Sequence, residues 1–187
     1  VEKIKWLPVM EVFGEGIFIE LDENLIMEYL GSEFVTNEMI HLYKNVDRSS
    51  DLVKKIFLHT FSHLLMRAVS VESGYSLASL KERIYGEEGQ FGILVYTSTP
   101  DSEGTLGGLS RLAKKERMES IIVNTLKYSS ICSNDPLCHD GTLSEHEEAN
   151  GSACHTCLLV PETSCEEFNR HLSRTLVEGL LDELDLS

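Results

Sequence analysis

The chain has 187 residues, of which 42% are hydrophobic and 25% charged, as in a soluble domain with a buried core. No stretch approaches the roughly 18 consecutive apolar residues that span a bilayer, and the first residues lack the basic-then-apolar order of a secretory signal. The net charge of −15 repels phosphate backbones, which disfavours independent nucleic-acid binding. We therefore expect a cytoplasmic chain of one domain, residues 1–187, and its first residue, Val, suggests a piece of a longer polypeptide.

The N-terminal part is predicted to combine short strands with helices. Alternating apolar residues and glycines predict a hairpin or two short strands over residues 11–23, and a short helix over 24–30 follows. Residues 31–50 have no regular pattern. Asp51 is predicted to cap a long helix over 51–73, with an apolar face, which Gly74 ends.

The remaining elements are predicted in the same way. Residues 76–84 are expected to form a short helix, and the apolar run 91–99 a buried strand at the centre of the fold. A glycine-rich loop and a helix over 112–128 follow. The segment from Cys132 to Cys165 is aperiodic, and Ser164 begins a capping box for a last helix that continues through Leu180. The fold class is α+β, mainly helical with a small central sheet.

One group of basic residues stands out in this acidic chain. It comprises Arg111, Lys114, Lys115 and Arg117. Short basic runs are common on helix surfaces, so we interpret this group as the solvated start of a helix.

All five cysteines lie in the aperiodic segment before or at the last helix: Cys132, Cys138, Cys154, Cys157 and Cys165. In a reducing compartment such clustering indicates a metal rather than disulfides. A two-residue gap lets both sulfurs of a turn bind one ion, and zinc takes four ligands in a tetrahedron. We predict one closed, structural, four-cysteine zinc site.

The predicted ligands of that zinc are Cys138, Cys154, Cys157 and Cys165. The capping box places Cys165 in the first turn of a helix, where the dipole favours a thiolate. Cys132, at the end of an apolar helix, is expected to be packed as a small hydrophobe, and it remains the alternative fourth ligand. His139 and His155 lie beside the cysteines and are weaker candidates.

Two other groups suggest chemistry. His59 and His63 share a helix face, but HTFSH lacks the glutamate of the zincin motif, which favours core or interface histidines over ligands. Asp101 and Glu103 lie in the glycine-rich loop after the predicted central strand. An alternative function is therefore a metal-dependent, nuclease-like enzyme that uses Asp101, Glu103 and His59 or His63.

The ordered motifs HTFSHLLMR, GYSLASLKERIYG, GILVYTSTPDSEGTLGGL, CSNDPLC, ACHTC and PETSCEEFNRHL resemble the MrfA-type zinc-binding domain. This family occurs in certain superfamily 2 helicases and in the helicase-associated B component of the DISARM anti-phage system. The likeness covers about residues 7–181, and the forms CSNDPLC and PETSCE resemble the DISARM branch more than the helicases.

The resemblance implies a Zn²⁺ site at Cys154, Cys157 and Cys165, with Cys138 or Cys132 as the fourth ligand. It also implies a non-catalytic accessory domain that docks on a superfamily 2 helicase subunit and meets DNA through that complex. The sequence contains no Walker motif, so an ATPase would belong to another segment or chain.

Overall fold

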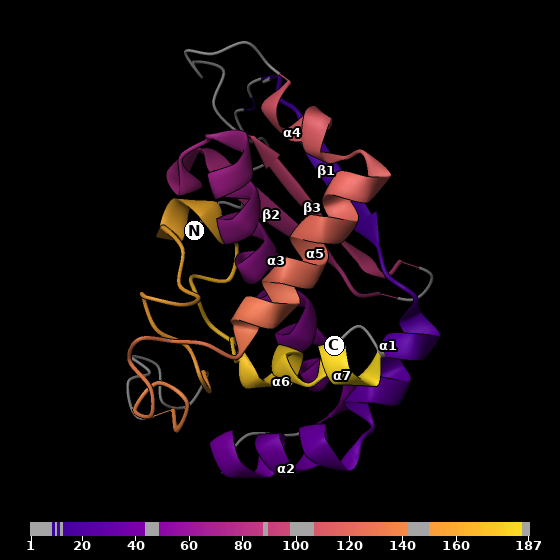
Figure 1. Ribbon diagram of the computed structural model, residues 1–187, viewed down its shortest axis with the longest axis vertical. Helices are drawn as coiled ribbons and strands as arrows, with labels where there is room; N and C mark the ends of the chain where they lie inside the picture. The colour runs from indigo at the N-terminus through magenta and orange to yellow at the C-terminus, as the bar shows by residue number, and fades with distance from the viewer. Residues whose placement is uncertain are drawn as a thin grey trace, which may run out of the picture.

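The computed structural model describes residues 9, 11, 13–43, 49–87, 90–97, 107–141 and 150–184 (Figure 1). Its elements are, in chain order, β1 (Gly16–Glu20), α1 (Glu23–Leu30), α2 (Glu33–Leu42), α3 (Ser50–Ser73), η1 (Leu77–Ser79), β2 (Leu80–Tyr85), β3 (Gly92–Thr97), α4 (Gly108–Leu112), α5 (Lys115–Ser129), η2 (Glu162–Ser164), α6 (Thr175–Glu178) and α7 (Leu180–Glu183). The predicted class is confirmed: the fold is mainly helical, with a small antiparallel sheet.

The sheet has the strand order β1-β3-β2, so β3 is its central strand, as predicted for the apolar run. Both neighbours are antiparallel to β3, and Leu94 lies opposite Phe18 on one side and Arg83 on the other. Ile93 and Val95 are buried because one face of the sheet packs against helices. Among the described residues of the region where a hairpin or two strands were predicted, one strand forms, β1.

The prediction of a helix over residues 76–84 is wrong. Apart from the three residues of η1, this region forms strand β2. Leu80 and Glu82 are buried on the inner face of the strand, whereas Arg83 is exposed. A carboxylate in the middle of the inward-facing row breaks the apolar alternation by which such strands are recognised.

Helix α3 is the central element of the fold. Figure 1 shows it against the sheet, with α5 beside it, and it contacts β2, β3, α5 and α6. Residues 56–66 are buried on every side of this helix, as expected for a helix that lies within a core. Ser49 rather than Asp51 is the N-cap, since its hydroxyl accepts the N–H of Leu52 at 3.4 Å. Gly74 ends the helix with a φ of +81°, in agreement with the prediction.

Two further helices differ from the prediction. Helix α2 occupies the region without a regular pattern, where Ser32 caps it and Val35 and Met39 are buried. Phe34 and Ile40 on the same helix are exposed, which obscures the helical period. The predicted helix over 112–128 forms as α4 and α5, two helices separated by a short turn.

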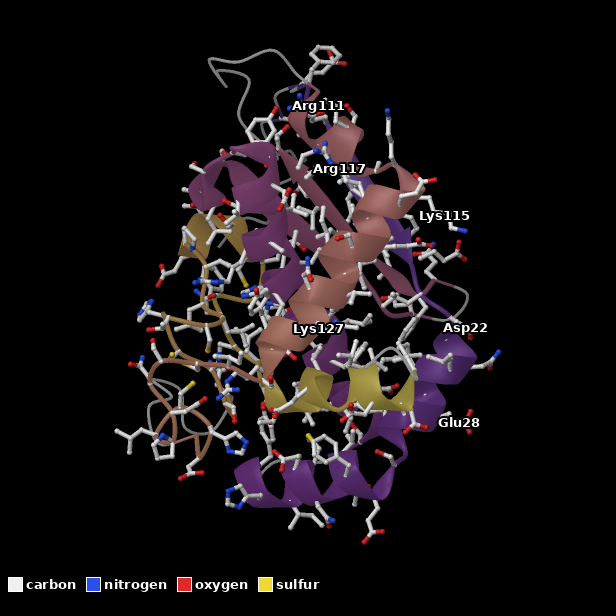
Figure 2. All side chains as sticks on the ribbon, in the orientation of Figure 1. Asp22, Glu28, Arg111, Lys115, Arg117 and Lys127 are labelled. Atoms are coloured by element: carbon white, nitrogen blue, oxygen red, sulfur yellow. The ribbon has the colours of Figure 1, made fainter. Side chains whose placement is uncertain are left out.

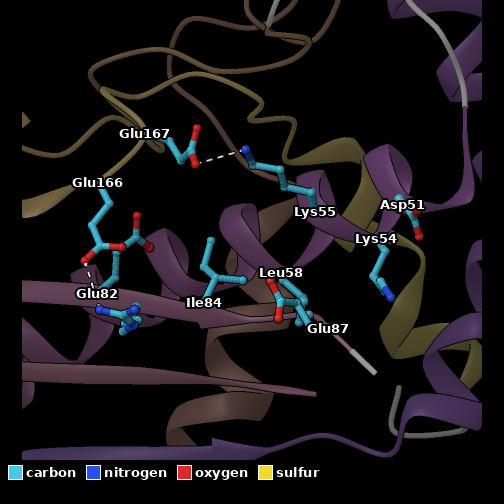
Figure 3. A pocket seen from close by; sticks show the side chains of 11 residues that line it. Asp51, Lys54, Lys55, Leu58, Glu82, Ile84, Glu87, Glu166 and Glu167 are labelled. Carbon is cyan, nitrogen blue, oxygen red and sulfur yellow. Dashed lines mark ion pairs between the residues drawn. The ribbon is translucent and has the colours of Figure 1, made fainter. Parts of the chain in front are cut away.

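A groove of about 610 Å³ opens between the start of α3 and β2 (Figure 3). Glu166 and Glu167, from the segment after η2, border it. Glu167 pairs with Lys55 at 2.9 Å, and Glu166 lies 3.9 Å from Arg83. Glu82 forms part of the wall of this groove.

The predicted basic group lies at the junction of α4 and α5. Its four side chains are exposed, and Lys115 lies 3.8 Å from Glu119 one turn further along α5. Figure 2 shows Arg111, Lys115 and Arg117 near this junction and Lys127 at the opposite end of α5. In the described part of the chain, no helix is both long and apolar enough to cross a membrane.

Glu15, just before β1, holds the start of α4. Its carboxylate accepts the backbone N–H groups of Gly107, Leu109 and Ser110 at 2.9, 3.0 and 3.1 Å and the hydroxyl of Tyr75 at 2.6 Å. Burial alone would raise the pKa of Glu15, but these hydrogen bonds outweigh burial and lower it to about 2. The carboxylate therefore stabilises the fold only while it is ionised.

Replacing Glu15 with Gln is expected to lower the free energy of unfolding by about 1–2 kcal/mol at pH 7, because charge-assisted hydrogen bonds are lost. Since the folded-state pKa is depressed, the stabilisation is present above the unfolded value near 4.5 and is lost as the pH falls toward 2. Urea unfolding of wild type and variant at pH 7 and pH 3 should show the difference shrinking. Glu20→Gln, an exposed change on β1, is the control, and a constant difference at both pH values would contradict this role.

Candidate metal centre

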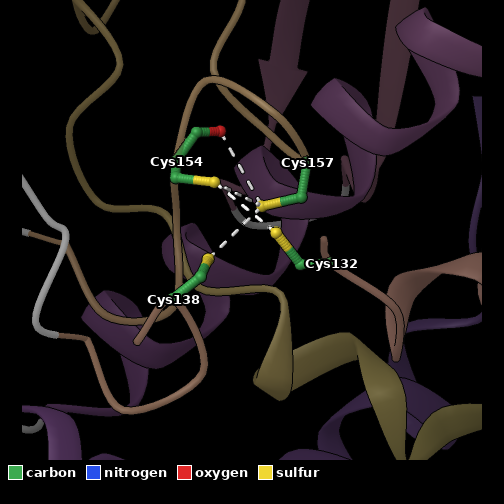
Figure 4. A group of neighbouring side chains, drawn as sticks. All are labelled: Cys132, Cys138, Cys154 and Cys157. Atoms are coloured by element: carbon green, nitrogen blue, oxygen red, sulfur yellow. Dashed lines mark hydrogen bonds between the residues drawn. The ribbon is translucent and has the colours of Figure 1, made fainter. Parts of the chain in front are cut away.

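Four cysteines converge beside the end of α5 (Figure 4). Cys132 follows α5, Cys138 lies six residues further, and Cys154 and Cys157 form the turn that precedes Leu158. The sulfur of Cys154 is 3.6 Å from those of Cys132 and Cys157, and the sulfur of Cys138 is 3.6 Å from that of Cys157. All four cysteines are free thiols.

The spacing of these sulfurs fits a tetrahedral zinc ion. Zinc–sulfur bonds of about 2.3 Å place four tetrahedral ligands about 3.8 Å apart, close to the observed separation. The separation is far greater than the roughly 2.05 Å of a disulfide bond. Cys138 is fully buried, Cys132 and Cys154 are nearly so, and Cys157 is half-buried. Four sulfurs in such a protected position could hold one Zn²⁺ ion in a closed, structural site.

Local turns aim the first pair of cysteines at the centre. The N–H of Asp135 donates to the carbonyl of Cys132 at 3.1 Å, and the N–H of Cys138 donates to the carbonyl of Asn134 at 3.0 Å. The Asp135 carboxylate accepts the N–H groups of Cys132 and His139, both at 3.1 Å. These bonds fold CSNDPLC into a compact loop with both sulfurs on one side.

The second pair lies on a tight turn supported by α3. The N–H groups of Leu158 and Leu159 both donate to the carbonyl of Cys154, at 3.0 and 3.1 Å. Arg67 of α3 donates to the carbonyls of Thr156 and Leu159 at 2.7 and 3.1 Å. The CxxC turn is therefore fixed to the central helix of the fold.

Hydrogen bonds also favour thiolates at this site. The N–H of Asn134 donates to the sulfur of Cys132, and its side-chain amide donates to the sulfur of Cys154, each at 3.4 Å. Burial would raise the pKa of Cys154, but the Asn134 amide and the backbone N–H groups of Thr156 and Cys157 lower it to about 6. A thiolate is the form that binds zinc.

Arg174, whose side chain is fully buried, lies next to this centre. Its guanidinium donates to the carbonyl of Ser129 at 3.1 Å and to the carboxylate of Asp135 in a close ion pair. Contact with Cys157 and burial raise the pKa of Cys138, whereas Arg174 opposes this increase. A zinc ion with four thiolates carries a charge of about −2, so a buried cation at this position offsets part of it.

The structure does not bring Cys165 to these sulfurs. Cys165 lies instead with His59, His63 and Glu82, and Cys132 takes the fourth place beside Cys138, Cys154 and Cys157. The expected helix at Ser164 is absent: Cys165 ends the three-residue η2, and the next helix begins at Thr175. The intervening backbone has positive φ at Phe168, Asn169 and His171, which no helix permits.

Side-chain amides hold this non-helical segment in place. Asn169 accepts the N–H of Val160 at 3.0 Å and donates to the carbonyl of Val160 at 2.8 Å. Asn150 donates to the carbonyl of Asn169 at 2.7 Å and accepts the N–H of Leu172 at 2.9 Å. Such long-range bonds leave no periodic trace in the sequence, although the repeated pairing of cysteines, 132 with 138 and 154 with 157, was a usable signal.

The other predicted residues fall in different places. His59 and His63 are buried, as expected of core histidines. Burial raises the pKa of the Cys165 thiol, but the hydrogen bond from the His59 imidazole outweighs burial and lowers the pKa to about 7. Asp101 and Glu103 lie outside the described residues. Within the described ranges, the groups of side chains close enough to share an ion do not include His139 or His155.

Comparison with known proteins agrees with this geometry. A family model described as the MrfA Zn-binding domain matches residues 61–158, a range that contains the four clustered cysteines and ends before Cys165. The chain is also similar to a protein of Bacillus paralicheniformis named DISARM protein DrmB, with 41% identity over 189 residues. That alignment covers 95% of this chain and 34% of the relative, so the chain spans about a third of the relative's length. The chain belongs to the MrfA Zn-binding domain family.

Proposed function

We propose that this chain is a non-catalytic, zinc-stabilised accessory domain of a helicase-associated anti-phage defence protein. The observation that carries the proposal is the 41% identity to the DISARM protein, which extends over 95% of the chain. The closed four-cysteine site supports it, because such sites stabilise folds and leave no ligand position open for a substrate. We propose that the zinc ligands are Cys132, Cys138, Cys154 and Cys157.

The biological setting is part of the same proposal. We place the chain as a single domain within a longer cytoplasmic protein, because its relative is about three times its length. One cluster of buried apolar side chains, running from Ile17 to Leu180, supports a single domain. The domain docks on a superfamily 2 helicase subunit, which supplies the motor activity, and it contributes to DNA engagement in that assembly.

A metal-dependent nuclease is the competing function. Hydrolysis by a metal requires an open coordination position, and His59 and His63 are completely buried. Their surroundings therefore favour a structural role. Divalent-dependent DNA cleavage by the purified chain, abolished by Asp101→Ala, would support the nuclease instead.

Co-purification tests the docking proposal. The full-length protein that contains this chain should co-purify with the helicase subunit, whereas a form lacking residues 1–187 of this chain should not. Cys138→Ser, which removes a proposed zinc ligand, should weaken the association, and Ser133→Ala, an exposed change in the same loop, should not. Undiminished association of the deleted form would contradict the docking proposal.

The same preparations test DNA engagement. The isolated chain should bind DNA weakly at physiological salt, because its net charge of −15 opposes phosphate contact. In the assembled complex, Lys114→Glu should lower DNA affinity if the exposed junction of α4 and α5 faces the DNA. Lys127→Glu, at the far end of α5, is the matched control for charge. Equal losses in both variants would indicate only a general electrostatic effect.

A further inference from the structure

A second group of potential ligands lies inside the fold, apart from the four cysteines. It consists of His59 and His63 from α3, Glu82 from β2 and Cys165 after η2, and their ligand atoms all lie within 4.8 Å of one another. The exposed fractions of the four residues are 0%, 0%, 1% and 5%. Burying the charges of four ionisable side chains costs free energy, which contacts among them or with a bound ion must offset.

The atoms that meet are the ones that bind metals. Nε2 of His59 is 3.1 Å from the sulfur of Cys165 and 2.9 Å from Oε1 of Glu82, and Nε2 of His63 is 3.1 Å from the same Oε1. Tetrahedral zinc, with bonds of about 2.0–2.3 Å, sets such ligand atoms about 3.4–3.6 Å apart. An outward shift of about 0.5 Å would therefore accommodate the ion.

A partner outside the group fixes which nitrogen of His63 faces its centre. Nδ1 of His63 lies 3.1 Å from the carbonyl of Leu158, which only accepts, so Nδ1 carries a proton. In the neutral ring, Nε2 then directs a lone pair at the Glu82 carboxylate, and two acceptors at 3.1 Å require a proton or a metal ion between them. A backbone carbonyl on the second nitrogen of a histidine is a usual support for a metal ligand.

Glu82 and Cys165 are held in the same manner. Ser62, between the two histidines on α3, donates its hydroxyl to Oε2 of Glu82 and leaves Oε1 for the centre. The N–H of Asn169 donates to the sulfur of Cys165 at 3.3 Å, which favours the thiolate. Ser62 and Asn169 thus each donate one hydrogen bond from outside the group, and Oε1 of Glu82 and the sulfur of Cys165 face its centre.

Charge balance favours a divalent ion over protons. Without a metal, balancing one carboxylate and one thiolate takes two imidazolium ions, and all four charges are buried. One Zn²⁺ with two neutral imidazoles, a carboxylate and a thiolate has a net charge of about zero. A neutral centre needs no buried counterion, in contrast to the four-thiolate centre with its neighbour Arg174.

We propose that His59, His63, Glu82 and Cys165 hold a second zinc ion, in a closed structural site that ties α3, β2 and the segment after η2 together. Nitrogen, oxygen and sulfur together suit zinc, and all four positions are filled by the protein. Glu82 also lines the groove of Figure 3. Because Leu158 directly follows Cys157, the second site also supports the CxxC turn of the first.

Zinc content and coordination test the proposal. The purified chain, freed of any histidine tag, should contain two zinc ions, whereas Cys165→Ser and His63→Gln should each contain one. Ser164→Ala, a buried change beside Cys165 that removes no ligand, should retain two. X-ray absorption at the zinc edge should give about 2.5 sulfurs per zinc in wild type, with nitrogen or oxygen in the rest, and about four in Cys165→Ser.

If the variants do not fold, the wild-type measurements decide alone. One zinc per chain with an all-sulfur shell, unchanged after incubation with added zinc, would overturn the proposal and leave a proton-linked buried cluster. Two zinc ions in folded Cys165→Ser would overturn the assigned ligands. The inference does not rest on the helicase or DNA proposals, since none of these measurements involves a partner.

Discussion

Changing Cys132 to Ser is expected to remove the zinc of the four-cysteine site and to leave a chain that aggregates or is cut rapidly by proteases. The sulfur of Cys132 lies 3.6 Å from that of Cys154 and occupies the fourth corner of the group. Structural zinc contributes on the order of 10 kcal/mol, comparable with the whole stability of a domain. Losing one ligand should therefore affect the entire fold, and Cys138→Ser should behave in the same way.

Zinc analysis, thermal unfolding and limited proteolysis check this result. Ser133→Ala, next to Cys132 and exposed, should retain the wild-type zinc content and melting temperature. If Cys132 were packed as a small hydrophobe, as the sequence predicts, Cys132→Ser would lower the free energy of unfolding by only about 1 kcal/mol. Full zinc and near-normal stability in Cys132→Ser, with loss of the all-sulfur zinc in Cys165→Ser, would restore the predicted set of ligands.

Arg174→Met is expected to lower the free energy of unfolding by about 1.5–3 kcal/mol, because it removes a fully buried cation that donates charge-assisted hydrogen bonds. Asp135 would lose its ion pair with Arg174, and the carbonyl of Ser129 would lose the hydrogen bond that it accepts from Arg174. The negative charge of the four thiolates would also lose the nearby positive charge of Arg174. Asp135 also holds the backbone N–H groups of Cys132 and His139, so its displacement should loosen the first cysteine pair.

Denaturant unfolding with zinc present measures this loss, and a competing chelator reports the change in zinc affinity. The matched control is Arg170→Met, an exposed change in the same segment, which should stay within about 0.5 kcal/mol of wild type. Equal stability of the two variants would show that Arg174 is not needed to compensate the metal centre. Loss of stability without a change in zinc affinity would limit its role to Asp135 and Ser129.

Several features of this protein were determined by local sequence. The apolar run that forms β3, the long helix α3 with its terminal Gly74, and the presence of a cysteine-rich metal segment were all predictable. Each depends on residues a few positions apart, such as a buried strand, a helix end or a CxxC turn. The series of motifs also predicted the family to which the chain belongs.

Other features were decided only by the tertiary structure. The region expected to be a helix forms strand β2, in which the buried Glu82 interrupts the apolar alternation. The burial of Glu82 is explained only by its contacts with His59 and His63, about twenty residues away on α3. Cys165 joins that group because the side chain of Asn169 bonds to Val160 and the side chain of Asn150 bonds to Asn169 and Leu172, which holds this segment away from a helix. Five cysteines in one aperiodic segment admit several sets of four, and the choice depends on contacts between residues that are distant in sequence. Those contacts depend on how the chain packs as a whole, which local patterns do not encode.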